Sequence, residues 1–342
     1  MENPDRLSKA FRAPYVARML RMLRCIIVAS LQTIARRIRR GRLRPTWSFG
    51  FELVHRYLRV DWEDTADWDL VRLRDHMGRR PYSRKYVARA IARDATLGGI
   101  PTRTYAPKVA ASSGAILFLH GGSFIFGSAK TSHADLLARL ALETRAEVYG
   151  VDYRLAPEHP YPAQLEDAVA AFDALVAGGI APERIVLAGD SAGGNLALAV
   201  EVVLRDRGGH RPKALALLSP WCDLAMSTDS YRENAALDFG TRPALVTQAA
   251  AYAAGIDLTD PRVSPLHARL DGLPPTFVSW GACELLRDDA LALVAALRAA
   301  GVAVTTHEAE DMPHDPALFA ELHPSGRASL EALVAFVSAE VA

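Results

Sequence analysis

The sequence predicts an α/β fold in which helices cover both faces of a mostly parallel β-sheet. From residue 115 onward, short apolar runs alternate with stretches of helical periodicity, the pattern of strands buried on both faces. The chain has 342 residues, half of them apolar and 23% charged, which is enough for one large domain and an appendage. In such sheets, ligands bind beyond the carboxyl ends of the strands, so we expect the functional residues directly after them.

The first predicted element is a long helix over residues 15–40. Its apolar residues recur at steps of three and four positions and form one stripe, with arginines on the other faces. The stripe consists of Val16, Met19, Leu20, Leu23, Ile26, Ile27, Leu31, Ile34 and Ile38. Two interpretations are open: the stripe packs on the main domain, or it lies in a membrane surface, as basic amphipathic helices do.

The charge of the chain is unevenly distributed. Residues 1–45 contain eleven Arg and one Lys against two acidic residues, whereas the remainder holds 28 basic and 37 acidic residues. This positive charge is local and no nucleic-acid-binding motif accompanies it, so we expect no nucleic-acid partner. Three widely spaced cysteines, Cys25, Cys222 and Cys283, predict neither a disulfide framework nor a metal site, which favours a cytoplasmic setting.

The remaining elements follow in alternation. Two strands joined by a Gly-Gly turn are predicted within residues 92–107. Six further strands are predicted at residues 115–119, 146–152, 184–190, 213–219, 274–280 and 302–308. Helices are predicted near residues 133–144, 163–178, 191–206, 287–300 and 327–340. An irregular insertion separates the strand at 213–219 from the next one.

The stretch GDSAGG (189–194) directly follows a predicted strand and carries a G-x-S-x-G pattern centred on Ser191. A sharp turn from strand to helix crowds the backbone, so glycine at 189 and 193 relieves contacts that a Cβ would make. The serine hydroxyl is left at a helix N-terminus, where backbone N–H groups favour a negative charge. A serine N-cap flanked by glycines is the simpler interpretation, but the position between strand and helix favours a nucleophile.

A second glycine-rich stretch, HGGSF (120–124), also follows a predicted strand. Acyl transfer needs preorganised N–H donors that stabilise the oxyanion of a tetrahedral intermediate. The expected donors are the backbone N–H groups of Gly121, Gly122 or Ser123, together with that of Ala192 after the nucleophile. A phosphate-binding loop is the rival interpretation, but no G-K-[ST] follows. His120 is expected to brace the loop.

A nucleophilic serine needs a base, because its free hydroxyl is a poor nucleophile. In enzymes with this strand-to-helix turn, the chain order is serine, acid, histidine. Three histidines lie beyond residue 284. His307 falls in a predicted strand and His323 stands at the entry to the last helix, whereas His314 lies in the loop after the last strand. His314 is therefore the predicted base.

Together these residues resemble the hormone-sensitive-lipase family of α/β-hydrolases, especially its microbial carboxylesterases. The resemblance covers residues 90–340 and rests on the ordered segments HGGSFIFGS, VDYRLAPEHPYPAQLEDA, GDSAGGNLAL, LLSPWCDL, DPRVSPL, GLPPTFVSWGACELLRDD and MPHDPALF. It implies an eight-stranded, mostly parallel sheet, a helical cap and hydrolysis of small acyl esters without a metal or cofactor.

The resemblance also implies two regions. Residues 1–85 would contain the basic amphipathic helix and part of the cap, and residues 86–342 would form the catalytic domain, with a cap insertion around 222–258. One position departs from the family, because Ser123 stands where a third glycine is usual. Its N–H group remains a donor, while its Cβ narrows the floor of the pocket, so loss of activity is not expected.

Three carboxylates in SWGACELLRDD (279–289) compete for the role of triad acid. An acid a few positions past the strand end can reach the histidine and stabilise its imidazolium, and Glu284 lies in that loop. Asp288 and Asp289 instead begin a helix, where carboxylates complement the dipole and cap free N–H groups. Similar family members carry an acid at the position of Glu284. We therefore predict Glu284, with Asp288 as the alternative.

These residues predict a serine carboxylesterase for short- to medium-chain acyl esters, with Ser191, Glu284 and His314 as its triad. The same triad would serve an N-acetyl or amide hydrolase, or a hydrolase of steroid esters, terpenoid esters or lactones. A non-catalytic ligand receptor should lack part of the triad and is disfavoured. No cofactor or metal is expected, and the oligomeric state is left open. Peripheral association with an anionic membrane through residues 15–40 is the second interpretation of the first helix.

Overall fold

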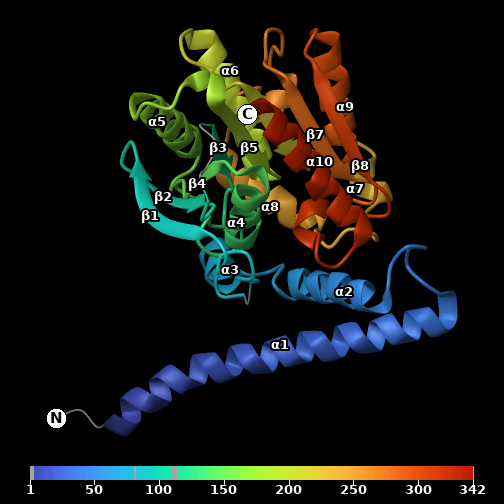
Figure 1. Cartoon of the computed structure of the whole chain (residues 1–342). Helices are drawn as coiled ribbons and strands as arrows, with labels where there is room; N and C mark the ends of the chain where they lie inside the picture. The colour runs from blue at the N-terminus through green and yellow to red at the C-terminus, as the bar shows by residue number, and fades with distance from the viewer. Residues whose placement is uncertain (1–3, 81, 110–113, 342) are drawn as a thin grey trace.

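The centre of the molecule is one sheet of eight strands, in the order β1-β2-β4-β3-β5-β6-β7-β8 (Figure 1). This computed structural model describes residues 4–80, 82–109 and 114–341, and only the backbone of residues 4–17. The strands are β1 (Ile91–Leu97), β2 (Ile100–Ala106), β3 (Ala115–Leu119), β4 (Glu147–Val151), β5 (Ile185–Asp190), β6 (Ala214–Leu218), β7 (Thr276–Gly281) and β8 (Val304–Ala309). β2 pairs antiparallel with β1 and β4, and the other pairs are parallel, which confirms the predicted fold class.

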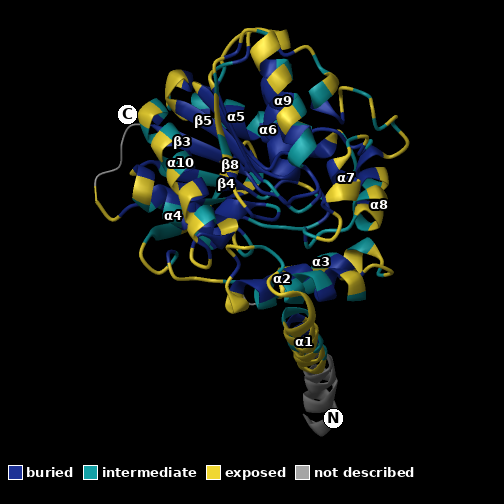
Figure 2. Cartoon of the chain, turned by 90° about the vertical axis from the view of Figure 1, so that its right-hand side faces the viewer, coloured by how far each residue is buried: buried dark blue, intermediate teal, exposed yellow. Residues whose placement is uncertain are grey.

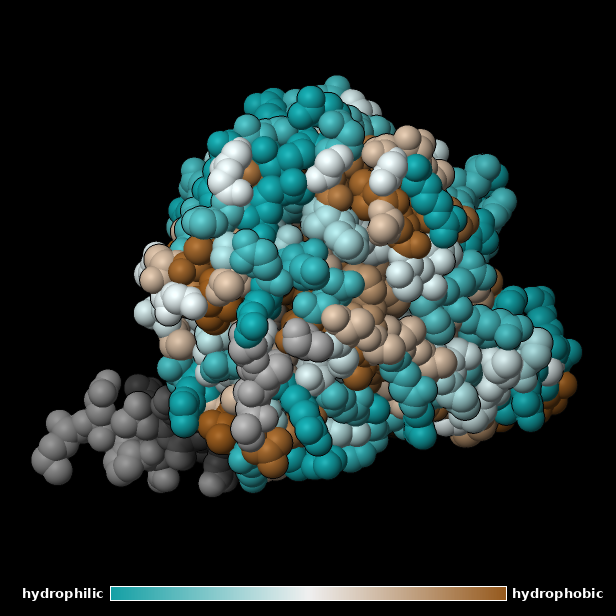
Figure 3. Space-filling view, turned by 45° about the horizontal axis from the view of Figure 1, so that its top comes forward, coloured by the Kyte–Doolittle hydropathy of each residue, from teal (hydrophilic) through white to brown (hydrophobic). Residues whose placement is uncertain are grey.

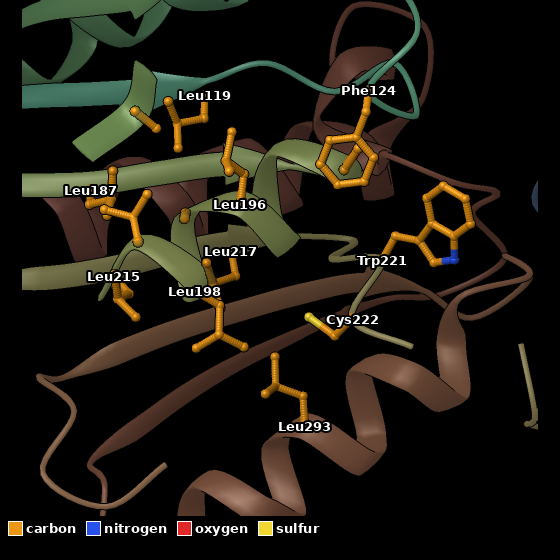
Figure 4. Close-up of a cluster of buried hydrophobic side chains, with 14 of the residues drawn as sticks. Leu119, Phe124, Leu187, Leu196, Leu198, Leu215, Leu217, Trp221, Cys222 and Leu293 are labelled. Carbon is orange, nitrogen blue, oxygen red and sulfur yellow. The ribbon is translucent and has the colours of Figure 1, made fainter. Parts of the chain in front are cut away.

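Helices cover both faces of the sheet, which is why its central strands are apolar on both sides. Along β3, Leu117 and Leu119 pack into one cluster, and Ile116 and Phe118 pack into another on the opposite face. Figure 4 shows the first of these clusters, to which α6 and α9 contribute. The covering helices are α4 (Ala134–Thr144), α5 (Ala163–Ala177), α6 (Ala192–Arg207), α9 (Arg287–Ala299) and α10 (Pro324–Val341). All predicted strands and these five helices occur, with ends displaced by three residues at most.

Three N-terminal helices lie outside the sheet, beyond one of its edges (Figures 1 and 2). They are α1 (Pro4–Arg40), α2 (Phe49–Asp64) and α3 (Leu70–Gly78). The side chain of Ser48 accepts a hydrogen bond from the N–H of Phe51 and begins α2, and Asp69 caps α3 in the same way through Arg72. α1 contains the predicted helix over residues 15–40.

The apolar stripe of α1 does not pack on the main domain, so the first interpretation of this helix is wrong. Every described member of the stripe is exposed, from 40% at Ile26 to 80% at Ile38. The side chain of Val16 lies outside the described residues. α1 instead contacts α2 through its opposite side, where Cys25 and Ala29 are buried beside Val60. Small side chains allow the two helices to approach closely, which the larger stripe residues would prevent.

The insertion between β6 and β7 contains two helices, α7 (Ser230–Glu233) and α8 (Arg242–Ala253). Its residues Phe239 and Ala244 pack against Trp62 and Met77, which belong to α2 and α3. Phe239 also lies 6.1 Å, centroid to centroid, from the ring of His314. The insertion and the N-terminal helices therefore meet above the carboxyl edge of the parallel strands.

Candidate active site

Ser191 occupies the sharp turn between β5 and α6, with φ 53° and ψ −120°. This conformation is unfavourable for a residue with a Cβ and persists only where the surroundings impose it. Here the N–H of Ser191 donates to the carbonyl of Leu218 at 2.8 Å, and its carbonyl accepts from the N–H of Trp221 at 3.0 Å. These two bonds fix the backbone of Ser191 and present its hydroxyl beyond the sheet edge.

The glycines beside Ser191 are required by close backbone contacts. A Cβ on Gly193 would lie 2.0 Å from the carbonyl oxygen of Leu119, and a Cβ on Gly189 would lie 2.3 Å from that of Gly193. Neither contact is possible for a real side chain, and backbone atoms cannot give way as a flexible side chain can. This confirms the prediction that glycine is needed at 189 and 193 because the turn crowds the backbone.

The structure brings Ser191, His314 and Glu284 together from three separate loops. The Nε2 atom of His314 lies 2.9 Å from the Oγ of Ser191, and its Nδ1 atom lies 3.2 Å from Oε2 of Glu284. The two rival histidines are elsewhere, His307 on β8 and His323 immediately before α10. Ser191 and Glu284 are buried and His314 is nearly so, which leaves the three groups little access to bulk water.

Glu284 is fully buried and is held by a second donor that the sequence did not reveal. The hydroxyl of Ser219 donates to Oε2 of Glu284 at 2.7 Å and accepts from the N–H of Asp315 at 3.2 Å. Burial raises the pKa of the Glu284 carboxyl, and the hydrogen bonds from His314 and Ser219 oppose that rise. Ser219 thus ties the acid to the loop that carries the histidine.

Asp288 and Asp289 lie in the first turn of α9, as predicted, but their carboxylates do not cap that helix. Asp288 accepts a hydrogen bond from the N–H of Ser230 at 2.9 Å. Asp289 is fully buried and accepts from the hydroxyl of Tyr231 at 2.9 Å. Both acids therefore anchor the insertion to α9, and neither contacts His314 in the described part of the chain.

The prediction that the N–H group of Gly121 is an oxyanion donor is wrong. The N–H of Gly121 donates to Oδ1 of Asp190 at 2.9 Å, so it is not available to a substrate. In contrast, the N–H groups of Gly122, Ser123 and Ala192 have no acceptor within the described residues. They lie beside Ser191 at the start of α6 and in the adjacent glycine-rich loop, where developing negative charge is favoured.

His120 braces the glycine-rich loop, as expected. Its ring is stacked on Tyr153 at 4.4 Å, and its Nδ1 atom lies 2.8 Å from the carbonyl oxygen of Gly121. The hydroxyl of Tyr153 donates to the carbonyl of His120 at 2.6 Å. On the other side, Asp190 links this loop to His133 at 3.0 Å. The loop is therefore fixed by partners on both sides before any substrate arrives.

Asp315 is a site residue that the sequence analysis missed. Its Oδ2 atom lies 3.2 Å from Nε2 of His314, and its Oδ1 atom has no hydrogen-bond partner among the described residues. Burial raises the pKa of the Asp315 carboxyl well above its usual range. Burial also opposes the charge on His314, but the carboxylates of Asp315 and Glu284 outweigh it and raise the pKa of the imidazole to about 10. The contact between Asp315 and Nε2 of His314 therefore favours the protonated imidazole.

A pocket of about 480 Å³ opens onto Ser191 and His314. This volume lies in the ordinary range for small-molecule sites. Its apolar walls come from α2, from the insertion, and from the residues around α4 and the loop before α10. The apolar lining includes Leu58, Trp62, Phe126, Leu136, Phe239, Leu245, Leu318 and Phe319. Within the described residues, no group of three or more His, Cys, Asp or Glu side chains is arranged to hold a metal ion.

Sequence comparison places this arrangement beside known hydrolases. Residues 116–318 match the family described as having the alpha/beta hydrolase fold. The acetyl-hydrolase of Streptomyces hygroscopicus is 42% identical over 223 residues, which cover 65% of this chain and 74% of that protein. The carboxylesterase NlhH of Mycobacterium tuberculosis is 36% identical over 240 residues, which cover 67% of this chain and 75% of that protein.

Solved structures extend the similarity over nearly the whole chain. An esterase from the bacterial hormone-sensitive lipase family aligns with a TM-score of 0.74 and 32% identity, over 94% of this chain and 98% of its own. A mutant of the esterase E40 aligns with a TM-score of 0.77 and 34% identity, over 83% of this chain and 98% of its own. The likeness thus includes both the sheet and most of the helices outside it.

Proposed function

Because the chain belongs to the hormone-sensitive-lipase family of α/β-hydrolases, we propose that it is a serine carboxylesterase in which Ser191, His314 and Glu284 form the catalytic triad. It is a carboxylic ester hydrolase, as its esterase and carboxylesterase relatives are. A triad of this kind is recognised by geometry and roles rather than by sequence position.

In the first half of the reaction, Nε2 of His314 takes the proton of the Ser191 hydroxyl as Oγ attacks the ester carbonyl carbon. The carbonyl oxygen becomes an oxyanion that accepts hydrogen bonds from the N–H groups of Gly122, Ser123 and Ala192. The bond to the alkoxy oxygen then breaks, and His314 returns the proton to the departing alcohol. The acyl group is left on Ser191 as an ester.

In the second half, water replaces the alcohol. His314 takes one proton from the water as its oxygen attacks the acyl-serine carbonyl, and the same N–H groups hold the second oxyanion. Collapse breaks the bond to Oγ, releases the carboxylic acid and returns the proton to Ser191. Throughout, Glu284 keeps Nδ1 of His314 as the hydrogen-bearing nitrogen and stabilises the imidazolium.

The observation that carries this proposal is the continuous chain of contacts from Ser191 through His314 to Glu284, at 2.9 Å and 3.2 Å. The pocket supports the choice of substrate, because its apolar walls favour an uncharged acyl chain of short to medium length. The acid in this chain is a glutamate, fully buried and held by Ser219. A non-catalytic receptor would not need these contacts.

The first prediction is that Ser191→Ala abolishes turnover of p-nitrophenyl butyrate, because it removes the hydroxyl that lies 2.9 Å from Nε2 of His314. A fluorophosphonate should label the native chain at Ser191 and leave the variant unlabelled. Ser338→Ala, on α10 and outside the pocket lining, serves as a matched control that should keep native activity. Undiminished hydrolysis by Ser191→Ala would overturn the assignment.

The acetyl-hydrolase relative favours a second candidate, removal of an acetyl group from an amide. A panel of p-nitrophenyl esters from acetate to palmitate, measured beside an acetanilide, separates the two. An esterase of the proposed class gives its highest kcat/KM on a short- or medium-chain ester. A higher kcat/KM on the acetanilide would move the assignment to amide hydrolysis on the same triad.

A further inference from the structure

The outer side of α1 carries a continuous apolar surface that nothing in the described chain covers. The residues Leu20, Leu23, Ile27, Leu31, Ile34 and Ile38 follow one another at steps of three and four positions and are all exposed. Met19, Met22 and Ile26 widen this surface toward the N-terminal end of the described side chains. On the part of the molecule turned toward the viewer in Figure 3, apolar residues instead occur as small groups among hydrophilic ones. Apolar surfaces of this extent mark interaction sites.

This surface cannot turn inward, because the other side of α1 is fixed to α2. Arg21 pairs with Asp61 and Asp64, each at 2.9 Å, and Arg37 pairs with Glu52 at 2.7 Å. The pairs lie near the two ends of the contact between the helices. Figure 2, which views α1 nearly along its axis, shows α2 between α1 and the sheet. The ion pairs therefore set the rotation of α1 and hold its apolar stripe toward solvent.

The charges beside the stripe are of one sign. Residues 18–40 contain seven arginines and no aspartate or glutamate. Arg24 is 66% exposed at one edge of the stripe, although it also contacts Asp64, and Arg39 and Arg40 are exposed at the C-terminal end of the helix. A partner for this helix must therefore combine an apolar layer with negative charges at its border.

We propose that α1 docks the protein on the surface of an anionic lipid bilayer, with the stripe in the interfacial layer and the arginines among the headgroups. No helix within the described residues is long and apolar enough to cross a membrane. The helix lies in the plane of the surface, because its apolar residues follow one side of the cylinder along its length. This association is separate from the catalytic chemistry.

A second copy of the chain fits the surface less well than lipid does. Helix pairs need a narrow apolar seam, usually with opposite charges beside it, whereas this stripe is broad between Met19 and Ile27. Because α1 carries no carboxylate in residues 18–40, two such helices side by side would bring arginines against arginines. Anionic headgroups supply the missing negative charge.

Docking in this way places the catalytic pocket close to the lipid. Leu58 and Trp62 of α2 line the pocket, while α1 covers the outer side of the same helix. Two helices, α1 and α2, then lie between the bilayer and the pocket.

Co-sedimentation of the full chain with sucrose-loaded vesicles tests the proposal. We expect binding to vesicles of equal parts phosphatidylcholine and phosphatidylglycerol to exceed binding to phosphatidylcholine alone by at least about tenfold, and to weaken as salt is raised. Leu31→Asp with Ile34→Asp should lower that binding at least about tenfold, because both charges enter the apolar stripe. Arg39→Glu with Arg40→Glu should weaken it on the anionic vesicles only.

Val246→Asp with Leu291→Asp is the matched control, since both residues are exposed apolar positions on other helices, α8 and α9. The control pair should bind vesicles as the native chain does. All variants should keep the native melting temperature, which shows that they are folded, and should hydrolyse a water-soluble ester at the native rate. Equal loss of binding in the control and stripe pairs would overturn the proposal. Absence of native binding, or a dimer in light scattering that the stripe pair dissociates, would overturn it as well.

Discussion

At the scale of single residues, Glu284 differs from its neighbouring acids in what its carboxylate touches. Oε2 of Glu284 is shared by His314 and Ser219, whereas the carboxylates of Asp288 and Asp289 bind residues of the insertion. Asp288 and Asp289 thus serve as structural anchors, although they lie only four and five positions after the proposed triad acid. The strand end at Gly281 decides this division, because Glu284 lies in the loop directly after it, whereas Asp288 and Asp289 lie in α9.

Glu284→Gln should lower kcat about 10³- to 10⁴-fold on p-nitrophenyl butyrate, by analogy with removal of a buried triad acid. The amide keeps the shape but cannot stabilise the imidazolium. Asp288→Asn is the matched comparison and should retain activity within about threefold, since its N–H donor from Ser230 can still bond to the amide oxygen. A large loss in Asp288→Asn with none in Glu284→Gln would reverse the proposed roles.

Asp315 should control the acid limb of the pH–rate profile. Only the neutral imidazole of His314 accepts the proton of Ser191, so kcat/KM rises as pH increases through the pKa of His314. The Asp315 carboxylate raises that pKa, so Asp315→Asn should lower it and move the limb to lower pH by about one unit or more. Steady-state kcat/KM from pH 5 to pH 11 checks this. A limb that stays in place would show that Asp315 does not hold the proton with His314.

The meeting of Ser191, Glu284 and His314 could be predicted because each lies in the turn or loop that follows a strand. Two other facts could not. The N–H of Gly121 is taken by Asp190, and this depends on a contact between residues 69 positions apart. The approach of Asp315 to Nε2 of His314 depends on a left-handed backbone at Asp315, with φ 54° and ψ 62°, which sequence spacing does not reveal. The segment PHDP places an acid beside the base and was the only indication of it.

At the scale of elements, Asp61 joins the three N-terminal helices. It is buried on α2 and accepts hydrogen bonds from Arg21 of α1 and Arg80 after α3, with His76 of α3 at 3.0 Å. Burial alone would raise the pKa of the Asp61 carboxyl, but His76 and Arg80 lower it to about 2, below the ordinary value of 3.8. The charged form of Asp61 is therefore the one that holds these helices together.

Asp61→Asn should lower the free energy of unfolding by about 3 kcal/mol at pH 7, because it leaves buried cations without their counter-charge. Since the folded pKa is depressed, the stabilisation is present above about pH 4 and is lost as pH falls through about 2. Urea titrations at pH 7 and pH 3 should show that the free energy of unfolding changes less with pH in Asp61→Asn than in the native chain. Asp64→Asn, whose carboxylate is 20% exposed, should cost about 1 kcal/mol or less.

Strands could be predicted better than the helices outside the sheet. A buried strand is a short apolar run bounded by turns, and this pattern depends on the local sequence alone. Which way the α1 stripe faces depends instead on the helix that packs against α1. Carboxylates of α2 pair with arginines of α1 and so determine the side of α1 that faces α2. Periodicity located the stripe correctly, but the ion pairs to α2 determine that it faces outward. α2 and α3 themselves begin at the N-cap residues Ser48 and Asp69.

At the scale of the whole molecule, the uneven charge of the sequence takes two structural forms. Some N-terminal arginines are paired with α2, as Arg21 and Arg37 are, and so contribute to folding. Others, among them Arg39 and Arg40, are exposed at the outer end of α1. The first group explains how a strongly basic segment can dock on a body with an excess of acidic residues. The second group makes the proposed membrane-docking surface of the protein positively charged.

The two sides of the pocket differ in how much sequence change they tolerate. The turn at Ser191 and the glycine-rich loop form a wall of backbone, where a Cβ on Gly122 would meet the carbonyl of Phe126 at 2.1 Å. The opposite wall consists of side chains from α2 and the insertion, such as Trp62 and Phe239. In directed evolution, the substitutions that change substrate preference should therefore accumulate in the side-chain wall, while the backbone wall beside Ser191 stays almost unchanged.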